Sequence, residues 1–340
     1  MARFLIGESS EILIGRGLPR PLLPPSPARR RVAVLHQARS PSVADVVDSL
    51  EAGGVAVEVI DLPGGEEAKT LAAVEGVYHR LAGFELGRSD TVVTVGGGAT
   101  TDAGGFVAAT WLRGIEVVHV PTTLLAAVDA AIGGKTAVNL GGKNLVGAFW
   151  HPRRVAIDLD TLSGLPAALM RQGAAEAIKA GLIGAPALVE EYRIHGLAAP
   201  LEEVVPPAVR VKAEIVSDDF TERGNRAWLN LGHTIGHGIE FASGLSHGES
   251  VAIGLVAACA VSERLLGFDQ TRYVVETLER VGLPVRAPAV DRDRVLQLVA
   301  LDKKREADSI RMVLLGDVGA PQVVAVGPED VAHGLAAVGL

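Results

Sequence analysis

The stretch DTVVTVGGGATTDAGGF, residues 90–106, decides the fold that we expect for this chain. Its first part, DTVVTV, is apolar and rich in Val and Thr, which is typical of a buried β-strand. Glycines follow directly, and we expect a helix after them. In a strand–glycine–helix arrangement the backbone can approach a pyrophosphate at the helix N-terminus. The glycine spacing is not GxGxxG, so a tight turn without a ligand is the alternative.

Strand and helix signals alternate on both sides of this stretch. Apolar strands are predicted at residues 32–35, 55–62 and 116–120, and a helix at 43–52 separates the first two strands. Strand–helix–strand spacing is the unit of a parallel sheet. The segment VAIDLDTLSGLP, residues 155–166, is interpreted as the last strand followed by a linker. The first half is therefore expected to form an α/β unit with a parallel sheet.

The second half of the chain differs, because helical periodicity dominates it. Two apolar segments, 311–316 and 322–327, are the exception and are predicted to form a short hairpin. A length of 340 residues exceeds what one hydrophobic core usually serves. We therefore predict two domains, residues 1–160 with a parallel sheet and residues 161–340 mainly α-helical.

The composition limits the classes of function. Hydrophobic residues make up 48% of the chain and aromatic residues only 4%, so the cores should consist of Ala, Val, Leu and Ile. The net charge of −8 disfavours nucleic acid as the main partner. The single cysteine, Cys259, excludes an internal disulfide. We recognise neither a signal peptide nor an apolar run long enough for a membrane span, so we expect a cytoplasmic protein.

Histidines cluster in LNLGHTIGHGIEFASGLSHGE, residues 229–249. His233 and His237 are four residues apart, which places both imidazoles on one face of a helix. His247 follows after a break that contains glycine, so the chain can fold back and bring it close. Imidazole is both a metal ligand and a proton shuttle. The cluster predicts a metal site, a proton-transfer site or both, against the alternative of surface histidines grouped by chance.

Polar residues suited to a phosphorylated ligand recur in the first half. Glu66 and Lys69 lie at the start of a helix, where they suit a hydroxyl and a phosphate, or simply a favourable helix N-terminus. Hydroxyl, charged and amide side chains then follow the strand at 116–120, among glycines that leave them accessible. They are Thr122, Thr123, Asp129, Lys135, Lys143 and Asn144.

The second half adds a comparable set. Glu176 and Lys179 are three residues apart on an Ala-rich helix, which indicates a surface salt bridge or a metal ligand beside a phosphate contact. Arg226 and Asn230 share a face by their spacing of four. Lys212 and Glu222 precede them, and the motif DKK, residues 302–304, lies near the end of the chain.

Taken together, these motifs resemble one family. In chain order they are PGGEEAK, GGGATTD, WLRG, VPTTLLAAVDAAIGGKTAVN, GKN, AAEAIKAG, RAWLNLGHTIGHGIE, HGE and DKK. In this order they resemble the 3-dehydroquinate synthase family of sugar phosphate cyclases. The resemblance implies an N-terminal Rossmann-like NAD domain, a C-terminal helical domain with a divalent metal (zinc, or alternatively cobalt), and an active site in the cleft between them. One departure is the end of the first predicted strand, LHQA at 35–38, where the family carries an acid-containing turn.

The resemblance also implies a role for each site residue. The metal ligands are Glu176, His233 and His247, so His237 is not a ligand and instead meets the phosphate side of the substrate and assists proton transfer. The residues implied in catalysis are His237, Lys179, Glu222 and Asp129. Those implied in substrate binding are Lys135, Asn144, Lys212, Arg226, Asn230, Lys303 and Arg113, the last reaching the active site of a neighbouring subunit in a homodimer. Those implied in NAD binding are Glu66, Lys69, Gly97, Gly98, Asp102, Thr122, Thr123 and Lys143.

The reaction implied is conversion of 3-deoxy-D-arabino-heptulosonate 7-phosphate into 3-dehydroquinate and phosphate, in the shikimate pathway. It combines oxidation by NAD, β-elimination of phosphate, reduction, ring opening and an intramolecular aldol closure. A cyclase making the amino analogue of dehydroquinate would keep nearly the same pocket. Cyclases making deoxy-scyllo-inosose or epi-valiolone tend to change Lys135, Asn230 or His237, all of which are of the dehydroquinate type here. NAD- and metal-dependent alcohol dehydrogenases and a non-enzymatic binding protein are the more distant alternatives.

Overall fold

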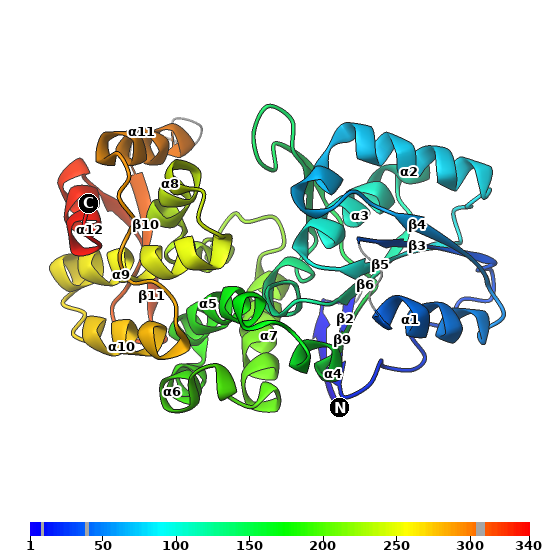
Figure 1. Ribbon diagram of the computed structural model, residues 1–340, viewed down its shortest axis with the longest axis horizontal. Coiled ribbons are helices and arrows are strands. Elements are labelled where there is room, and N and C mark those ends of the chain that lie inside the picture. The colour runs from blue at the N-terminus through cyan, green and yellow to red at the C-terminus, as the bar shows by residue number, and fades with distance from the viewer. Residues whose placement is uncertain (8–9, 38–40, 304–309) are drawn as a thin grey trace. The chain divides into compact units, whose positions relative to one another are not determined.

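The computed structural model describes residues 1–7, 10–37, 41–303 and 310–340 (Figure 1). The chain divides into two compact units, Met1–Leu165 and Pro166–Leu340. A boundary after residue 160, as expected from the sequence, would fall inside helix α4 (Leu159–Ser163). The segment interpreted as a linker after the last strand is therefore partly helical.

The first unit is built on a sheet of seven strands in the order β1-β2-β9-β6-β5-β3-β4. All neighbouring pairs are parallel except β1 and β2, which pair antiparallel at one edge. The sequence did not predict β1 and β2. The strands are β1 (Ala2–Ile6), β2 (Ser10–Gly15), β3 (Arg31–His36), β4 (Ala56–Asp61), β5 (Thr91–Gly96), β6 (Glu116–Pro121) and β9 (Arg154–Asp158).

Helices cover both faces of this sheet, α1 on one side and α2 with α3 on the other (Figure 1). Val34 and Val93 pack toward α1, whereas Leu35 and Val92 pack toward α2 and α3. Because the central strands are buried on both faces, their sequences are mainly apolar and do not alternate between apolar and polar residues. The helices are α1 (Pro41–Glu51), α2 (Leu71–Gly83) and α3 (Gly98–Thr110), with short 3-10 turns at Gly65–Lys69 (η1) and Trp111–Arg113 (η2).

A second, smaller sheet lies in the segment that follows β6. Strands β7 (Lys135–Val138) and β8 (Val146–Phe149) pair antiparallel, and a π-helical turn, η3 (Ala126–Ala130), precedes them. These two strands were not predicted, because each has only four residues and lies among glycines. Within the hairpin, Thr136 Oγ1 donates to Ala148 O at 2.8 Å. The hairpin packs on α3, since a Cβ on Gly105 would lie 2.5 Å from Thr136 Cγ2.

The second unit is mainly helical, as predicted. Its helices are α5 (Ala167–Gly184), α6 (Pro186–His195), α7 (Leu201–Asp218), α8 (His233–Ser243), α9 (His247–Leu266), α10 (Thr271–Val281), α11 (Arg292–Lys303) and α12 (Pro328–Ala337), with 3-10 turns at Gly196–Ala198 (η4) and Asn225–Asn230 (η5). The predicted hairpin near the C-terminus is confirmed, since β10 (Ile310–Leu315) pairs antiparallel with β11 (Pro321–Val326). In the part of the chain that the structure describes, no helix is long and apolar enough to cross a membrane.

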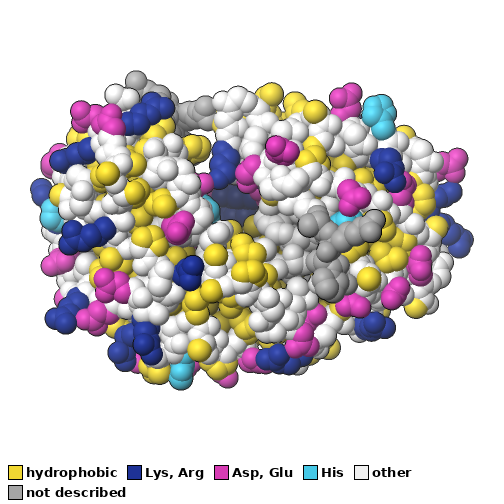
Figure 2. Space-filling view, viewed as in Figure 1, with side chains coloured by type: hydrophobic (Ala, Val, Ile, Leu, Met, Phe, Trp, Pro, Cys, Tyr) yellow, Lys and Arg dark blue, Asp and Glu magenta, His cyan; other side chains and the backbone are white. Residues whose placement is uncertain are grey.

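The surface carries both signs of charge. On the face drawn in Figure 2, Lys and Arg side chains are interspersed with Asp and Glu over both units. The described residues on this face therefore present no extended field of one sign. The expectation that nucleic acid is not the main partner stays a prediction.

Candidate active site

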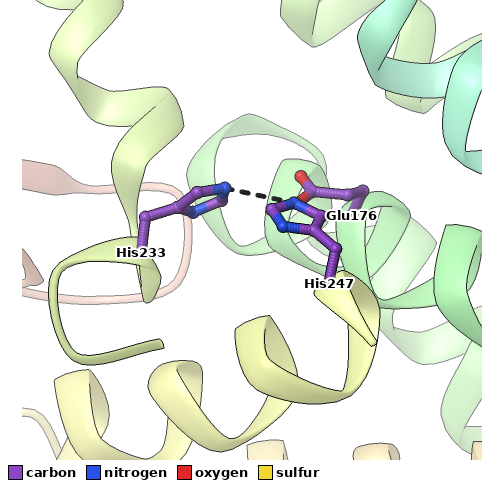
Figure 3. Close-up of side chains that lie close together, drawn as sticks. All are labelled: Glu176, His233 and His247. Carbon is purple, nitrogen blue, oxygen red and sulfur yellow. Dashed lines mark hydrogen bonds and ion pairs between the residues drawn. The ribbon is translucent and has the colours of Figure 1, made fainter. Parts of the chain in front are cut away.

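Three side chains from three helices of the second unit converge on one point. Glu176 lies on α5, His233 begins α8 and His247 begins α9 (Figure 3). Glu176 Oε1 is 3.4 Å from His233 Nε2 and 3.2 Å from His247 Nε2. Glu176 and His233 are buried, and His247 is partly exposed. Their ligand atoms lie within 4.8 Å of one another, which makes this set a candidate metal centre.

Local sequence explains why the two histidines begin their helices. Ser246 donates its backbone N–H and its hydroxyl to Glu249 Oε2, at 3.0 and 2.6 Å, and this capping box starts α9 at His247. Gly232, with φ of +78°, turns the chain into α8. A Cβ on Gly254 would lie 1.9 Å from Gly232 O. Glycine at position 254 therefore lets α9 approach the start of α8 closely enough to bring the imidazoles together.

The outer ring nitrogens of both histidines have fixed partners. His233 Nδ1 lies 3.1 Å from Leu231 O, and His247 Nδ1 lies 3.0 Å from Glu240 Oε2. Since a carbonyl and a carboxylate only accept, each Nδ1 donates, and each Nε2 is left as the ligand atom facing Glu176. Two imidazole nitrogens and one carboxylate oxygen form a donor set that suits zinc or cobalt with one coordination position open. The residues present thus fit a divalent metal.

The charges around this set are strongly coupled. Glu176 Oε2 forms a close ion pair with Lys179 Nζ, and both side chains are buried. Burial opposes ionisation of Glu176, but the charges of Lys179 and His233 hold its pKa well below the usual range. Burial, together with the Lys179 charge, lowers the pKa of His233. For His247 burial acts in the same direction, but its contacts with Glu176 and Glu240 outweigh burial and raise its pKa to about 9.

These pKa shifts predict that metal binding releases a proton from His247. Below about pH 9 the metal-free protein carries His247 protonated, and a metal must displace that proton. The apparent metal affinity should therefore rise about tenfold per pH unit from neutral pH and level off near the His247 pKa. Metal-buffered titration of the wild-type protein at a series of pH values measures this slope.

Glu240→Gln is the matched variant for that titration. It removes one carboxylate that raises the pKa of His247 while it keeps an oxygen that accepts from Nδ1. The pH above which the apparent metal affinity stops rising should therefore be lower in this variant than in the wild-type protein. A metal affinity independent of pH over this range in the wild-type protein would contradict the assignment of His247 as a protonated ligand.

Gly248 offers a second, structural prediction. A Cβ at this position would lie 2.4 Å from Gln172 Cα and 2.6 Å from Gln172 O, so α9 packs directly on the backbone of α5. In Gly248→Ala the first turn of α9 must move away from α5, and His247 moves with it, away from Glu176. We expect metal affinity to fall about 10- to 100-fold and stability to fall by about 1–3 kcal/mol.

The control for Gly248→Ala is Gly76→Ala on α2, where a Cβ would meet nothing within 4 Å. This variant should be neutral or stabilising by up to about 1 kcal/mol. Equilibrium dialysis with metal and thermal unfolding measure both variants. Unchanged metal affinity in Gly248→Ala would show that the close contact does not position His247.

His237 lies beside the candidate metal centre. Its ring centroid is 5.0 Å from that of His233 and 6.0 Å from that of His247. The spacing argument thus placed His233 and His237 correctly near each other, but His233 is the one that faces Glu176. His237 instead groups with Glu240 and His247. The spacing alone could not show which of the two histidines, His233 or His237, faces Glu176.

Three other predicted residues of the second unit, Glu222, Arg226 and Asn230, lie in the segment before α8. Asn230 Nδ2 donates to Glu222 Oε1 at 3.0 Å. Arg226 is 1% exposed, lies over the Phe220 ring and donates to Phe220 O. Lys212 on α7 is also buried. Lys303 ends α11, and its side chain lies outside the described residues.

Asp219 shapes the loop between α7 and η5, and it was not among the residues predicted from the sequence. Its carboxylate accepts backbone N–H groups of Arg223, Gly224 and Arg226 at 2.8–3.0 Å. Those bonds, against the effect of burial, hold the pKa of Asp219 below its ordinary value. An Asp that precedes a glycine-containing loop is a known turn signal, which could have indicated this role.

In the first unit, the buried Lys69 is the centre of a polar cluster. Its Nζ lies 2.6 Å from Asp102 Oδ2 and also donates to Asn144 Oδ1. Burial raises the pKa of Asp102 despite the Lys69 charge, and the carboxylates of Glu66 and Asp129 add to this effect. Residues predicted from separate motifs are thus brought together here.

Asn139, which the sequence did not single out, joins two of these motifs. Its Nδ2 donates to Glu66 Oε2 at 2.9 Å, and its Oδ1 accepts from the Asn144 backbone N–H at 2.9 Å. Asn144 has a φ of +58°, a conformation that Asn tolerates better than most residues. Asn139 therefore holds the loop NLGGKN, residues 139–144, in place.

The glycine turn lies where β5 and β6 end. Thr122 N donates to Gly96 O at 2.9 Å, and Thr123 Oγ1 accepts from Ala126 N at 3.2 Å. A Cβ on Gly97 would lie 3.3 Å from Thr123 Cγ2, so the two segments are in close contact. Gly98 begins α3 directly after this turn. Lys135, Lys143 and Arg113 are exposed, the last with a φ of +70°.

The first unit has a Rossmann-like sheet with a glycine turn at its carboxyl edge. The helical unit that follows in the chain carries one carboxylate and two imidazoles. This combination defines the class that joins sugar phosphate cyclases and metal-dependent dehydrogenases. Within that class the family is shown. The model for the 3-dehydroquinate synthase N-terminal domain matches residues 59–172, and the model for its C-terminal domain matches residues 173–305. The chain belongs to the 3-dehydroquinate synthase family.

Individual relatives agree with this assignment. A 3-dehydroquinate synthase of Thermobifida fusca (strain YX) is 43% identical over 314 residues, covering 88% of this chain and 85% of the relative. Among solved structures, a 2-deoxy-scyllo-inosose synthase complexed with carbaglucose-6-phosphate, NAD+ and Co2+ has a TM-score of 0.86 and 27% identity over 100% of both chains. An NADH-dependent butanol dehydrogenase of Thermotoga maritima, at TM-score 0.67 and 17% identity over 98% of both chains, shares the fold alone.

Proposed function

We propose that this protein is a 3-dehydroquinate synthase that converts 3-deoxy-D-arabino-heptulosonate 7-phosphate into 3-dehydroquinate and phosphate. Family membership and the 43% identity to a relative of that name support the proposal. The structural observation that carries it is the position of Glu176. Its Oε1 faces the Nε2 atoms of His233 and His247, and its Oε2 pairs with Lys179. The same carboxylate can therefore bind a metal and hold a cation that faces the substrate.

Two cofactors are part of the proposal. We infer that Glu176, His233 and His247 hold a divalent metal, zinc or cobalt. We also infer that the first unit binds NAD through Glu66, Lys69, Gly97, Gly98, Asp102, Thr122, Thr123 and Lys143. When bound, the metal supplies polarisation of a substrate hydroxyl, and NAD supplies a hydride acceptor that is regenerated in each cycle.

The remaining site residues bind and orient the substrate in this proposal. Its phosphate and carboxylate need cationic partners, which Lys135, Lys212, Arg226, Lys303 and Lys179 supply. Asn144 and Asn230 offer amides for hydroxyl groups. Asp129 and Glu222 are the acidic residues proposed for the catalytic set, and Glu222 holds Asn230.

His237 is proposed to move protons near the departing phosphate. It is partly buried beside His233 and His247, yet it belongs to a different ligand group from Glu176. An imidazole in that position can exchange a proton with a phosphate oxygen without leaving its helix. In the β-elimination a base takes the C–H proton and the phosphate leaves with the electron pair of the C–O bond, so a nearby imidazole can assist by relaying the proton that a phosphate oxygen takes up.

Release of inorganic phosphate tests the proposed function. The purified protein, supplied with metal, NAD and the heptulosonate phosphate, should release phosphate with no net gain of NADH absorbance. A chelator should stop the release, and metal should restore it. Oxidation of the substrate with accumulating NADH and without release of phosphate would indicate a dehydrogenase instead. No turnover at micromolar enzyme would reject the proposal.

Two further expectations accompany this proposal. Arg113 is proposed to reach the active site of a partner subunit in a homodimer, and the exposed, left-handed turn that presents it is consistent with such a role. The cytoplasmic location also stays a prediction.

A further inference from the structure

The carboxyl ends of β3 and β4 carry a histidine–aspartate contact that the proposed function does not use. His36 Nε2 lies 3.0 Å from Asp61 Oδ1, and the two residues are paired in register across the strands. The His36 side chain is 2% exposed, whereas the Asp61 side chain is 76% exposed. A buried imidazole thus holds an exposed carboxylate, whose remaining lone pairs face solvent.

This pair lies on the sheet edge that carries the glycine turn. β3 is hydrogen-bonded to β4 on one side and to β5 on the other, and His36 is in register with Val95, which directly precedes Gly96. Neighbouring strands are about 4.8 Å apart. The Asp61 carboxylate, drawn toward β3 by His36, is therefore one to two strand spacings, roughly 5–10 Å, from the glycine turn.

Gln37 fixes the backbone of the same edge. Its Nε2 donates to Gly65 O at 2.8 Å, which joins the end of β3 to the turn η1 that carries Glu66 and Lys69. The end of β3, the end of β4 and the turn η1 are thus tied to one another by side chains of consecutive residues, His36 and Gln37.

We propose that Asp61, oriented by His36, accepts hydrogen bonds from the adenosine ribose hydroxyls of NAD and makes the site select NAD over NADP. In dinucleotide-binding sheets an acidic residue beyond the glycine turn takes this role, and its charge disfavours a 2′-phosphate. Here β3 ends in Leu35 and His36 without an acid, and the neighbouring strand β4 ends in Asp61. The inference rests on the proposed NAD-dependent function, and His36 is a positioning residue in it.

Calorimetric titration of the full-length protein with NADH and with NADPH tests this inference. The wild-type protein should bind NADH more tightly. Asp61→Asn should weaken NADH binding about 10- to 100-fold, because a charged hydrogen-bond acceptor is lost, and should leave NADPH binding nearly unchanged. Glu75→Gln, which neutralises an exposed carboxylate on α2, is the matched control and should change neither value.

His36 variants separate positioning from stability. His36→Gln keeps a donor for Asp61 and should retain most of the preference for NADH, whereas His36→Phe keeps none and should lose much of it. Thermal unfolding shows whether each variant is folded, and the ratio of the two affinities is insensitive to a partly unfolded fraction. If the ratio of NADH affinity to NADPH affinity is unchanged in both Asp61→Asn and His36→Phe, the inference is wrong.

The outcomes distinguish this inference from the proposed function. If the wild-type protein binds NADH and releases phosphate while Asp61→Asn weakens both dinucleotides equally, or neither, only the role of Asp61 is wrong. If the wild-type protein binds no NADH, the proposed NAD-dependent function is wrong, and this inference fails with it.

Discussion

Replacing His233 by alanine is expected to abolish stable metal binding and to lower turnover by more than about 100-fold. Even outer partners of metal ligands are worth about 10- to 100-fold in metal affinity or activity, so loss of a ligand should exceed that range. His233 Nε2 faces Glu176, and its Nδ1 is held by Leu231 O, so the ring is oriented with Nε2 as the ligand atom. Metal content after dialysis, measured by atomic emission, gives the first readout.

Two variants control this experiment. His195→Ala removes a largely exposed imidazole at the end of α6 and should retain metal. His237→Ala removes the neighbouring imidazole of the HxxxH pair and should lower turnover while it retains metal, because His237 is not grouped with Glu176. Metal loss in His237→Ala with retention in His233→Ala would show that the ligand assignment is wrong.

The second large effect is expected at Lys69. In Lys69→Met the carboxylate of Asp102, which lies on α3 and is 19% exposed, loses the buried cation that it pairs with. Removing one partner of a buried ion pair typically costs about 3–5 kcal/mol, because the other charge stays buried and uncompensated. Affinity for NADH should fall as well, since Lys69 also holds Asn144 and the loop that contains it.

Urea unfolding of the first unit measures the stability change. Trp111 and Trp150 report on this unit, and a Trp228→Phe background removes the tryptophan of the second unit. The double variant Lys69→Met with Asp102→Asn should regain part of the loss, because the uncompensated charge is gone. Arg88→Met, at an exposed cation, should stay within about 0.5 kcal/mol. If Lys69→Met lowered the free energy of unfolding by less than about 1 kcal/mol, that result would contradict a stabilising ion pair between Lys69 and Asp102.

Much of the fold followed from the sequence, and the failures have a common cause. Buried strands such as β5 and β6 are mainly apolar and do not alternate between apolar and polar residues, and that pattern does not depend on distant contacts. The missed strands β7 and β8 have four residues each, and their pairing depends on packing against α3. β1 and β2 were missed as well, and β2 depends on β9, which is more than a hundred residues away in the chain. Local patterns cannot specify such partners.

For the candidate site, residue types were predictable but partners were not. Spacing brought His233 and His237 to one helix face, whereas the choice of His233 to face Glu176 depends on how closely α8, α9 and α5 approach. That approach is set by glycines, Gly248 and Gly254, whose role is visible only in three dimensions. The same holds for Asp61: a single acid at a strand end gains meaning from His36 on the next strand.

The measurement that tests the central claim most directly is the ratio of phosphate released to NAD supplied. With the heptulosonate phosphate in excess and NAD held below the enzyme concentration, the account predicts many phosphate molecules released per NAD and no lasting rise in NADH absorbance. His233→Ala in the same assay should release none above background. Phosphate release that stops at one equivalent per NAD, or a steady accumulation of NADH, would contradict an enzyme that regenerates its cofactor in every cycle.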